Sequence, residues 1–181
     1  MTNGYGSVIM SLIIMNEPKE TKMSFIIREI TPEDNKALAE LIRYNLKNHA
    51  LDIPGTVYFD SSLDSLSDFY MENAGRGYYV LTLDGKVAGG IGLAEFPYFE
   101  SCAELQKLYL ADEVKGQGWG YKLIEYVEDR MREKGYKASY LETHDNLKVA
   151  IHTYEKSGYK KIERPESVVH GAMNNFYYKE L

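Results

Sequence analysis

A glycine-rich stretch that runs from Leu108 to Gly135 constrains this chain more than any other part of its sequence. Before the glycines, Leu108 and Leu110 follow the two-residue period of a β-strand. After them, apolar residues recur at the three- and four-residue spacing of a helix, at Leu123, Ile124, Val127 and Met131. Because the period changes across Lys115 to Gly120, the sequence predicts a strand joined to a helix by a glycine loop.

This loop has the properties of an anion-binding site. Gly116, Gly118 and Gly120 remove side chains from alternate positions, so a ligand could approach the backbone closely. The unpaired N–H groups of the first helical turn and the helix macrodipole both favour negative charge there. We therefore expect a diphosphate group to bind, and the alternative is a glycine-rich turn that binds nothing.

Two common nucleotide-binding loops do not fit the spacing. A dinucleotide fingerprint that starts at Gly116 would need its third glycine at Tyr121. A Walker loop needs Lys and then Ser or Thr directly after its last glycine, whereas Gly120 is followed by Tyr121 and Lys122. The diphosphate ligand is therefore expected to be of another kind.

The remaining patterns predict a single-domain α/β fold. Strands are expected at 25–30, 78–83, 87–93, 102–110, 138–142, 159–162 and 175–178. Helices are expected at 32–47, between 63 and 74, between the glycine loop and Gly135, and at 147–157. Mostly antiparallel strands with one parallel crossover around the loop give a mixed sheet with helices on both faces.

Two motifs within this order resemble those of the GCN5-related N-acetyltransferase (GNAT) family. The coenzyme A loop of that family has Arg or Gln, two residues, Gly, one residue, and Gly or Ala; here Lys115, Gly118 and Gly120 stand at those positions. The segment AIHTYEKSGY, from Ala150 to Tyr159, is similar to the family's A-x-x-x-Y-E-K-x-G-F. The resemblance covers nearly all of residues 24–181 and implies an acetyltransferase that uses acetyl-CoA as donor.

The resemblance also implies which residues bind the donor. In the family, the backbone at the end of the strand before the loop binds the pantetheine arm and polarises the thioester carbonyl, which here means Leu108, Tyr109 and Leu110. The loop itself then binds the diphosphate through residues 115–121: Lys115, Gly116, Gln117, Gly118, Trp119, Gly120 and Tyr121. Trp119 is expected to pack beneath the loop.

Three residues are candidates for acid–base catalysis. Tyr154 resembles the tyrosine that protonates the leaving thiolate, although its place on an apolar helix face also suits an ordinary core tyrosine. Glu104 and Glu142 match positions where some members carry the glutamate that removes the amine proton, and each could instead be a solvated strand residue. His144 is a third candidate for the base by its reference pKa.

Other positions bear on the donor and the acceptor. Many members have an asparagine that contacts coenzyme A seven residues before the tyrosine; here Leu147 stands there, and Asn146 is one residue away. The acceptor is expected to be a small-molecule or peptide amine. In the family, the first helices and the loop between them bind the acceptor. The corresponding loop here is 48–60, which contains His49, Asp52, Tyr58 and Asp60.

Composition excludes several other classes of protein. The net charge is −6 and the basic residues are scattered, so nucleic acid is not an expected partner. No apolar run reaches membrane-spanning length, and the single cysteine and the absence of a signal sequence favour the cytoplasm. Residues 1–22 are expected to form a flexible extension and residues 23–181 the domain. The four histidines show no metal-ligand spacing, so no metal site is expected.

The resulting hypothesis is a cytoplasmic N-acetyltransferase that transfers an acetyl group from acetyl-CoA to a primary amine by direct attack. Two alternatives keep the same fold without catalysis. One is an acyl-CoA-binding sensor or interaction module, and the other is a domain that uses the fold to form a homodimer.

Overall fold

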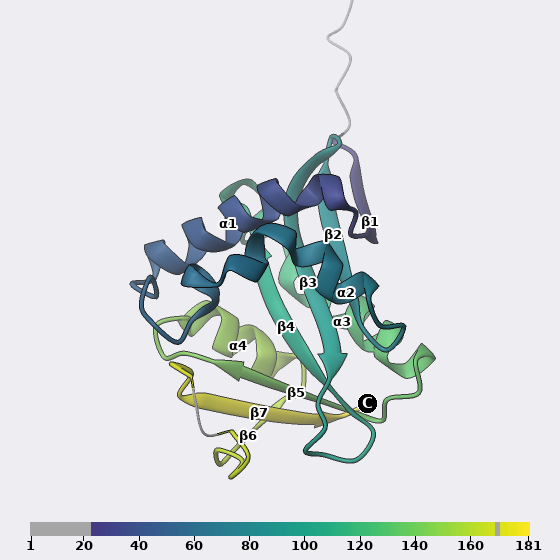
Figure 1. Cartoon of the computed structure of the whole chain (residues 1–181), viewed down its shortest axis with the longest axis vertical. Helices are drawn as coiled ribbons and strands as arrows, with labels where there is room; N and C mark the ends of the chain where they lie inside the picture. The colour runs from purple at the N-terminus through teal and green to yellow at the C-terminus, as the bar shows by residue number, and fades with distance from the viewer. Residues whose placement is uncertain (1–22, 169–170) are drawn as a thin grey trace, which may run out of the picture.

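A single seven-stranded sheet organises the part of the chain that the structure describes. The structure is a computed structural model, and it describes residues 23–168 and 171–181, so the extension expected at residues 1–22 lies outside the described residues. The strand order is β1-β2-β3-β4-β5-β7-β6 (Figure 1). The strands are β1 Phe25–Glu29, β2 Gly77–Leu83, β3 Lys86–Glu95, β4 Cys102–Leu110, β5 Ala138–Thr143, β6 Lys160–Ile162 and β7 Asn175–Glu180.

All neighbouring strands are antiparallel except β4 and β5, which are parallel. The crossover between these two strands contains the glycine loop and the helix that follows it. The mixed, mostly antiparallel sheet expected from the sequence is therefore confirmed.

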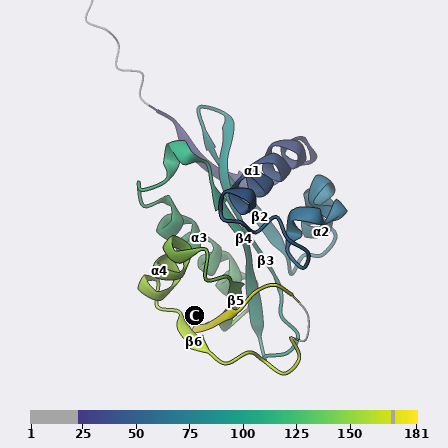
Figure 2. The ribbon, with the colours of Figure 1, turned by 90° about the vertical axis from the view of Figure 1, so that its left-hand side faces the viewer.

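Helices cover both faces of the sheet, as expected. Figure 2 shows α1 (Asn35–Asn48) and α2 (Leu66–Met71) on one side, and α3 (Trp119–Glu133) and α4 (Lys148–Lys156) on the other. The side chains buried against α3 and α4 form one core cluster, and those against α1 and α2 form a second. No helix among the described residues is both long enough and apolar enough to span a bilayer.

The structure differs from the expected helices at two places. The helix expected at 32–47 begins as a 3-10 helix, Pro32–Asp34, which α1 follows. The helix expected between residues 63 and 74 begins as a 3-10 helix, Ser61–Ser65, and continues as the short α2. The Asp60 side chain accepts a hydrogen bond from the Ser62 N–H and so caps the 3-10 turn. Leu63, Leu66 and Tyr70 are nevertheless all buried, which is the outcome that their spacing predicted.

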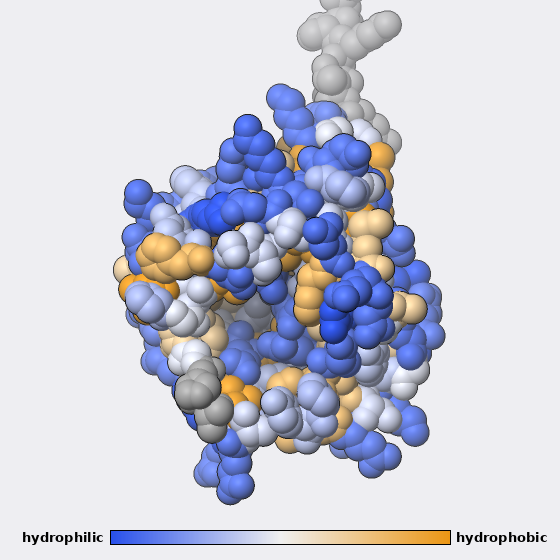
Figure 3. All heavy atoms as spheres, in the orientation of Figure 1, coloured by the Kyte–Doolittle hydropathy of each residue, from blue (hydrophilic) through white to orange (hydrophobic). Residues whose placement is uncertain are grey.

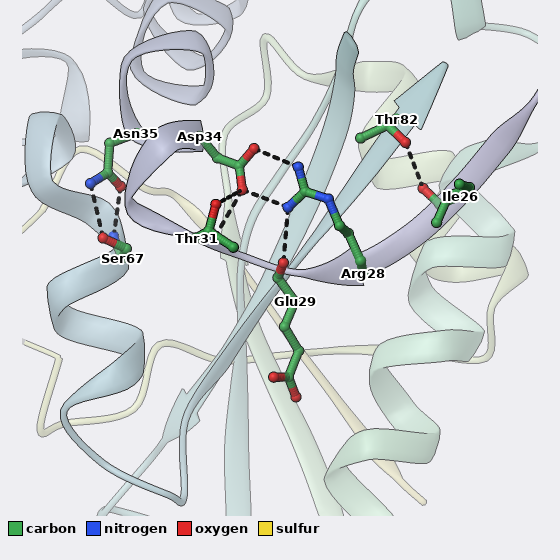
Figure 4. Close-up of polar contacts among 8 residues, drawn as sticks. All are labelled: Ile26, Arg28, Glu29, Thr31, Asp34, Asn35, Ser67 and Thr82. Atoms are coloured by element: carbon green, nitrogen blue, oxygen red, sulfur yellow. Dashed lines mark hydrogen bonds and ion pairs between the residues drawn. The ribbon is translucent and has the colours of Figure 1, made fainter. Parts of the chain in front are cut away.

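Arg28 and Asp34 connect the first strand to the start of α1 (Figure 4). The two nitrogens at the end of the Arg28 guanidinium donate to the two oxygens of Asp34 at 2.6 and 2.8 Å. The Thr31 N–H also donates to Asp34, which completes a capping box. The hydrogen bonds from Arg28 hold the pKa of the Asp34 carboxyl below its usual range, although burial of this side chain opposes the shift.

We predict that Asp34→Asn lowers the free energy of unfolding by about 1–3 kcal/mol at pH 7, since Arg28 loses its charged partner. A carboxyl whose pKa is depressed by folding stabilises the fold above its unfolded pKa, about 3.9, and loses that effect as the pH falls through the folded pKa. The difference between variant and wild type should therefore shrink below about pH 4. Denaturant titrations from pH 3 to 7 measure it.

Asp64→Asn is the matched control, because Asp64 accepts two hydrogen bonds from Arg43 in the same way but on the surface. Its cost should be small, because an exposed ion pair contributes little to stability. An Asp34→Asn cost no larger than that of the control, or one that does not change with pH, would contradict the assignment.

Candidate active site

The strands β4 and β5 separate soon after they begin. They pair only at Cys102, Ala103 and Glu104 of β4, and Figure 1 shows them diverging beyond this point. On this face of the molecule, Figure 3 shows a hollow near the middle, below α1 and beside α2. The edge of β4 that faces β5 therefore has main-chain groups available to a ligand from Leu105 onward.

A β-bulge in β4 accompanies this separation. Gly92 of β3 pairs with Gln106 and Gly90 pairs with Tyr109, so β4 has one more residue than β3 across this interval. Lys107 takes up the extra length with a φ of 49°, and the Tyr78 hydroxyl donates to its carbonyl at 3.0 Å.

The glycines of β3 make room for the aromatic side chains beside the bulge. A Cβ atom at Gly90 would lie 2.5 Å from the Tyr78 ring, and one at Gly92 would lie 2.6 Å from the Tyr70 hydroxyl. Glycines inside a strand are typical of a bulge or of a close approach by other atoms, and both occur here.

The main-chain groups of the three predicted residues at the end of β4 point in different directions. The Ala111 N–H donates to the carbonyl of Ala88 in β3. Because successive residues of a strand direct their main-chain groups to opposite edges, Tyr109 also directs its main chain toward β3. Leu110, and Leu108 two residues earlier, therefore direct theirs toward the gap between β4 and β5. The Leu110 carbonyl already accepts from the Asn45 side chain at 3.1 Å. Leu108 and the Leu110 N–H are the better candidates to bind a ligand.

The glycine loop presents a row of backbone N–H groups. Gly116 and Gly118 have φ values of 75° and 79°, which favour glycine, and a Cβ atom at either would meet open space. Within the described residues, the N–H groups of residues 116–121 donate to no other backbone group. Gly118 is the N-cap of α3 without a side-chain cap, so these N–H groups and the helix dipole are available to an anion.

The side chains of the loop are engaged with their own surroundings. Lys115 forms an ion pair with Asp112 at 2.6 Å, and the Gln117 amide donates to the Glu113 carbonyl. The Trp119 ring packs against Phe25 of β1, with a centroid separation of 4.6 Å. The loop therefore offers an anion mainly backbone N–H donors. The Lys115 ammonium lies beside these donors, in its ion pair with Asp112.

The two candidate glutamates lie on the same face of neighbouring strands. Glu104 pairs with Tyr140 of β5, and Glu142 follows two residues later, so both carboxyls lie on the α1–α2 side. Burial raises the pKa of Glu104, and the nearby Glu142 raises it further, while a 2.6 Å hydrogen bond from Gln106 opposes the rise. Burial also raises the pKa of Glu142, although the Tyr140 hydroxyl donates to it. The environment thus raises the proton affinity of both carboxyls, as the role of a general base requires.

Tyr154 is 6% exposed and lies beside Tyr109. Its hydroxyl makes no side-chain hydrogen bond with the residues that the structure describes, whereas the Tyr159 hydroxyl pairs with Ser139 at 2.7 Å. Burial raises the pKa of Tyr154, so the phenol stays protonated at neutral pH. Both interpretations of Tyr154 share this burial, and the unpaired hydroxyl favours the acid role.

The other sequence candidates have local partners. The His144 ring accepts a hydrogen bond from the Asn146 N–H through Nδ1, and the Asn146 amide donates to the His49 carbonyl. The His49 ring is hydrogen-bonded to the Asn45 carbonyl and Asp60 caps its 3-10 turn. These contacts join α1 to the loop before α4, and they leave His144 a weaker candidate for the base.

Sequence reasoning missed three polar residues beside Glu104. The Tyr70 hydroxyl donates to Gln106 at 2.9 Å, and Gln106 donates to Glu104, so α2 is connected to the candidate base. Lys107 follows at the bulge. The signal was present in the sequence, because the buried apolar positions of β4 change from odd numbers, Ala103 and Leu105, to even numbers, Leu108 and Leu110.

Comparisons with known proteins agree with this geometry. The family model described as "Acetyltransferase (GNAT) family" matches residues 43–159. The protein described as "Uncharacterized N-acetyltransferase YjgM" of Escherichia coli (strain K12) is 36% identical over 140 residues, which is 76% of this chain and 83% of that protein. The chain belongs to the acetyltransferase (GNAT) family, and it is an acyltransferase.

Solved structures show the same fold. An acetyltransferase of the GNAT family from Staphylococcus aureus Mu50 has a TM-score of 0.75 and 22% identity, covering 87% of this chain and 99% of that one. The PaiA N-acetyltransferase from Thermoplasma acidophilum, solved in complex with coenzyme A, has a TM-score of 0.69 and 24% identity over the same shares.

We predict that Gly90→Ala destabilises the protein by about 1–3 kcal/mol, because the added methyl group overlaps the Tyr78 ring that supports the bulge. Denaturant unfolding measures the change. Gly120→Ala is the control. Gly120 lies in α3, where alanine has the higher helix propensity, and an added Cβ atom would lie 3.4 Å from the Thr153 side chain. Stability should therefore stay within about 1 kcal/mol of wild type or rise. Equal effects of the two substitutions would contradict the close packing.

Proposed function

We propose that this protein transfers the acetyl group of acetyl-CoA to a primary amine by direct attack, without a covalent enzyme intermediate. The observation that carries the proposal is the glycine loop, whose free N–H groups lie at the start of α3, directly after the strand that separates from β5. A diphosphate on the loop would direct an attached chain toward the gap. The coenzyme A complex of the Thermoplasma protein supports this choice of donor.

The donor is bound mainly by backbone groups. The N–H groups of residues 116–121 bind the diphosphate, and Lys115 adds positive charge beside them. Leu108 and the Leu110 N–H bind the pantetheine arm where β4 and β5 separate, and one of these N–H groups polarises the thioester carbonyl. Because these donors are fixed by the sheet, they need little reorganisation as charge develops on the carbonyl oxygen.

A carboxylate must first make the acceptor amine neutral. Glu104 or Glu142 takes this proton, either directly or through water, and the raised pKa of each carboxyl suits that task. The neutral nitrogen then attacks the carbonyl carbon, a C–N bond forms and the C–S bond breaks. The nitrogen loses its second proton to solvent, which gives the neutral amide.

Tyr154 donates a proton to the thiolate as the C–S bond breaks. A phenol with a raised pKa is a weak acid, but burial also raises the pKa of a thiol, so the thiolate beside Tyr154 is a stronger base than in water. Bulk solvent then returns the proton to the tyrosine.

We propose a cytoplasmic location on the grounds of the single cysteine, and a domain that extends over residues 23–181. The acceptor is a small-molecule or peptide amine. The competing hypothesis is a module with the same fold that binds acyl-CoA but catalyses no transfer. Formation of a homodimer stays a prediction.

We predict that the purified protein binds acetyl-CoA with micromolar affinity in a calorimetric titration and that Gly118→Glu abolishes this binding. The glutamate would fill the open space at the loop and repel the diphosphate. Gly85→Glu is a matched control, since Gly85 has the same φ of 79° and equally open space at the β2–β3 turn. Loss of binding in both variants, or in neither, would contradict the proposed loop.

We predict that Tyr154→Phe lowers kcat by about 100-fold or more and changes acetyl-CoA affinity little, because the hydroxyl acts in the chemical step. Release of free thiol in the presence of a panel of amines measures turnover. Tyr159→Phe, which removes a hydroxyl bound to Ser139, is the control and should retain turnover.

If Tyr154→Phe retained full activity, the acid would have to be another group. If no amine in the panel released thiol although acetyl-CoA bound, the binding module would be the better hypothesis.

A further inference from the structure

Lys107 is an unusual lysine in this protein. Among the lysines within residues 23–168 and 171–181, only Lys107 and Lys179 are not in an exposed position. Lys179 donates two hydrogen bonds to the buried carboxylate of Glu128, at 2.8 and 2.7 Å. Lys107 forms no ion pair or side-chain hydrogen bond with any residue that the structure describes. A partly buried ammonium without a carboxylate partner is unfavourable, so its charge calls for a physical reason.

The groups around Lys107 compensate its charge only in part. Its ammonium lies 5.8 Å from the centre of the Tyr70 ring and 5.9 Å from that of Phe69, at the outer limit of a cation–π contact. Glu104 and Asp60 act on it from a distance, since they raise a pKa that burial lowers. Asp60 is also engaged by Ser62.

The same strand offers a negative group beside this positive one. Glu104 precedes Lys107 by three residues, and one of its carboxylate oxygens accepts from Gln106 while the other has no hydrogen-bond partner among the described residues. Glu142 on β5 adds a second carboxyl on this face. The face of the sheet beside Glu104 therefore presents two carboxylates that could bind an ammonium group. Beside them lies Lys107, a lysine without an ion-pair partner among the described residues.

We propose that the acceptor is an amine with a carboxylate group within a few bonds of its nitrogen, as in a free amino acid, and that Lys107 binds this carboxylate. The inference rests on the proposed function, because it assigns the two ends of the acceptor to Glu104 and Lys107. The acceptor's carboxylate supplies the charge-assisted partner that Lys107 lacks. A polyamine would instead bring another cation toward Lys107, where like charges repel.

The test compares each of several L-amino acids with its amide, which has the same bulk and no negative charge. Initial rates of thiol release give kcat/KM for both members of a pair, in wild type and in Lys107→Met. The methionine keeps the unbranched side chain at the same strained φ and removes the charge. Because the amide differs from the acid in intrinsic reactivity, the quantity of interest is the acid-to-amide ratio, in which that difference cancels between the two proteins.

We expect the acid-to-amide ratio of kcat/KM to fall at least about tenfold in Lys107→Met, and Lys107→Arg to restore part of it. Lys86→Met, at the exposed β2–β3 turn, should leave the ratio unchanged. Calorimetry with acetyl-CoA checks that each variant is folded and binds the donor.

An unchanged ratio in Lys107→Met, or a wild type that prefers diamines and amides to every amino acid, would overturn this inference and leave the proposed transferase intact. Absence of transfer to any amine despite acetyl-CoA binding would overturn the proposed function and this inference together.

Discussion

The bulge at Lys107 is the constraint on which the geometry of the site depends. An extra residue in β4 interrupts its ladder with β3, and on the other edge β4 stays paired with β5 for only three residues. The bulge is supported from β2, because the Tyr78 hydroxyl donates to the Lys107 carbonyl, and the glycines of β3 let the Tyr78 ring lie flat against the sheet. A regular β4 would continue alongside β5 and would leave no unpaired edge for a ligand.

Much of the fold was predictable from local patterns. The glycine loop, the helix after it and the Asp84-Gly85 hairpin turn are each encoded within a few residues, and the structure contains all of them. The short α2 was less predictable. The spacing of Leu63, Leu66 and Tyr70 reports only which side chains are buried, and a 3-10 turn followed by an α-helix can bury the same side chains.

The polar part of the site was predictable only in outline. Glu104 and Glu142 could be named from the sequence, but the hydrogen bonds from Tyr70 through Gln106 to Glu104 join residues that lie far apart along the chain. Lys107 was missed because a lysine with a φ of 49° has no propensity signal of its own. The change in the parity of the buried residues of β4 was the available indication, and it requires that both faces of the strand be assigned first.

Two partly buried lysines show how charge is used differently in this fold. Lys179 and Glu128 form an ion pair between β7 and α3. This pair connects the two elements, and neither charge is available to a ligand. Lys107 and Glu104 lie close on one strand, yet each retains unmatched charge, and Glu104 has a raised pKa. Had the two formed a direct ion pair, the pKa of Glu104 would be lowered and the carboxylate would be a poorer base. Keeping the two charges apart leaves Glu104 able to accept a proton and Lys107 able to bind an anion.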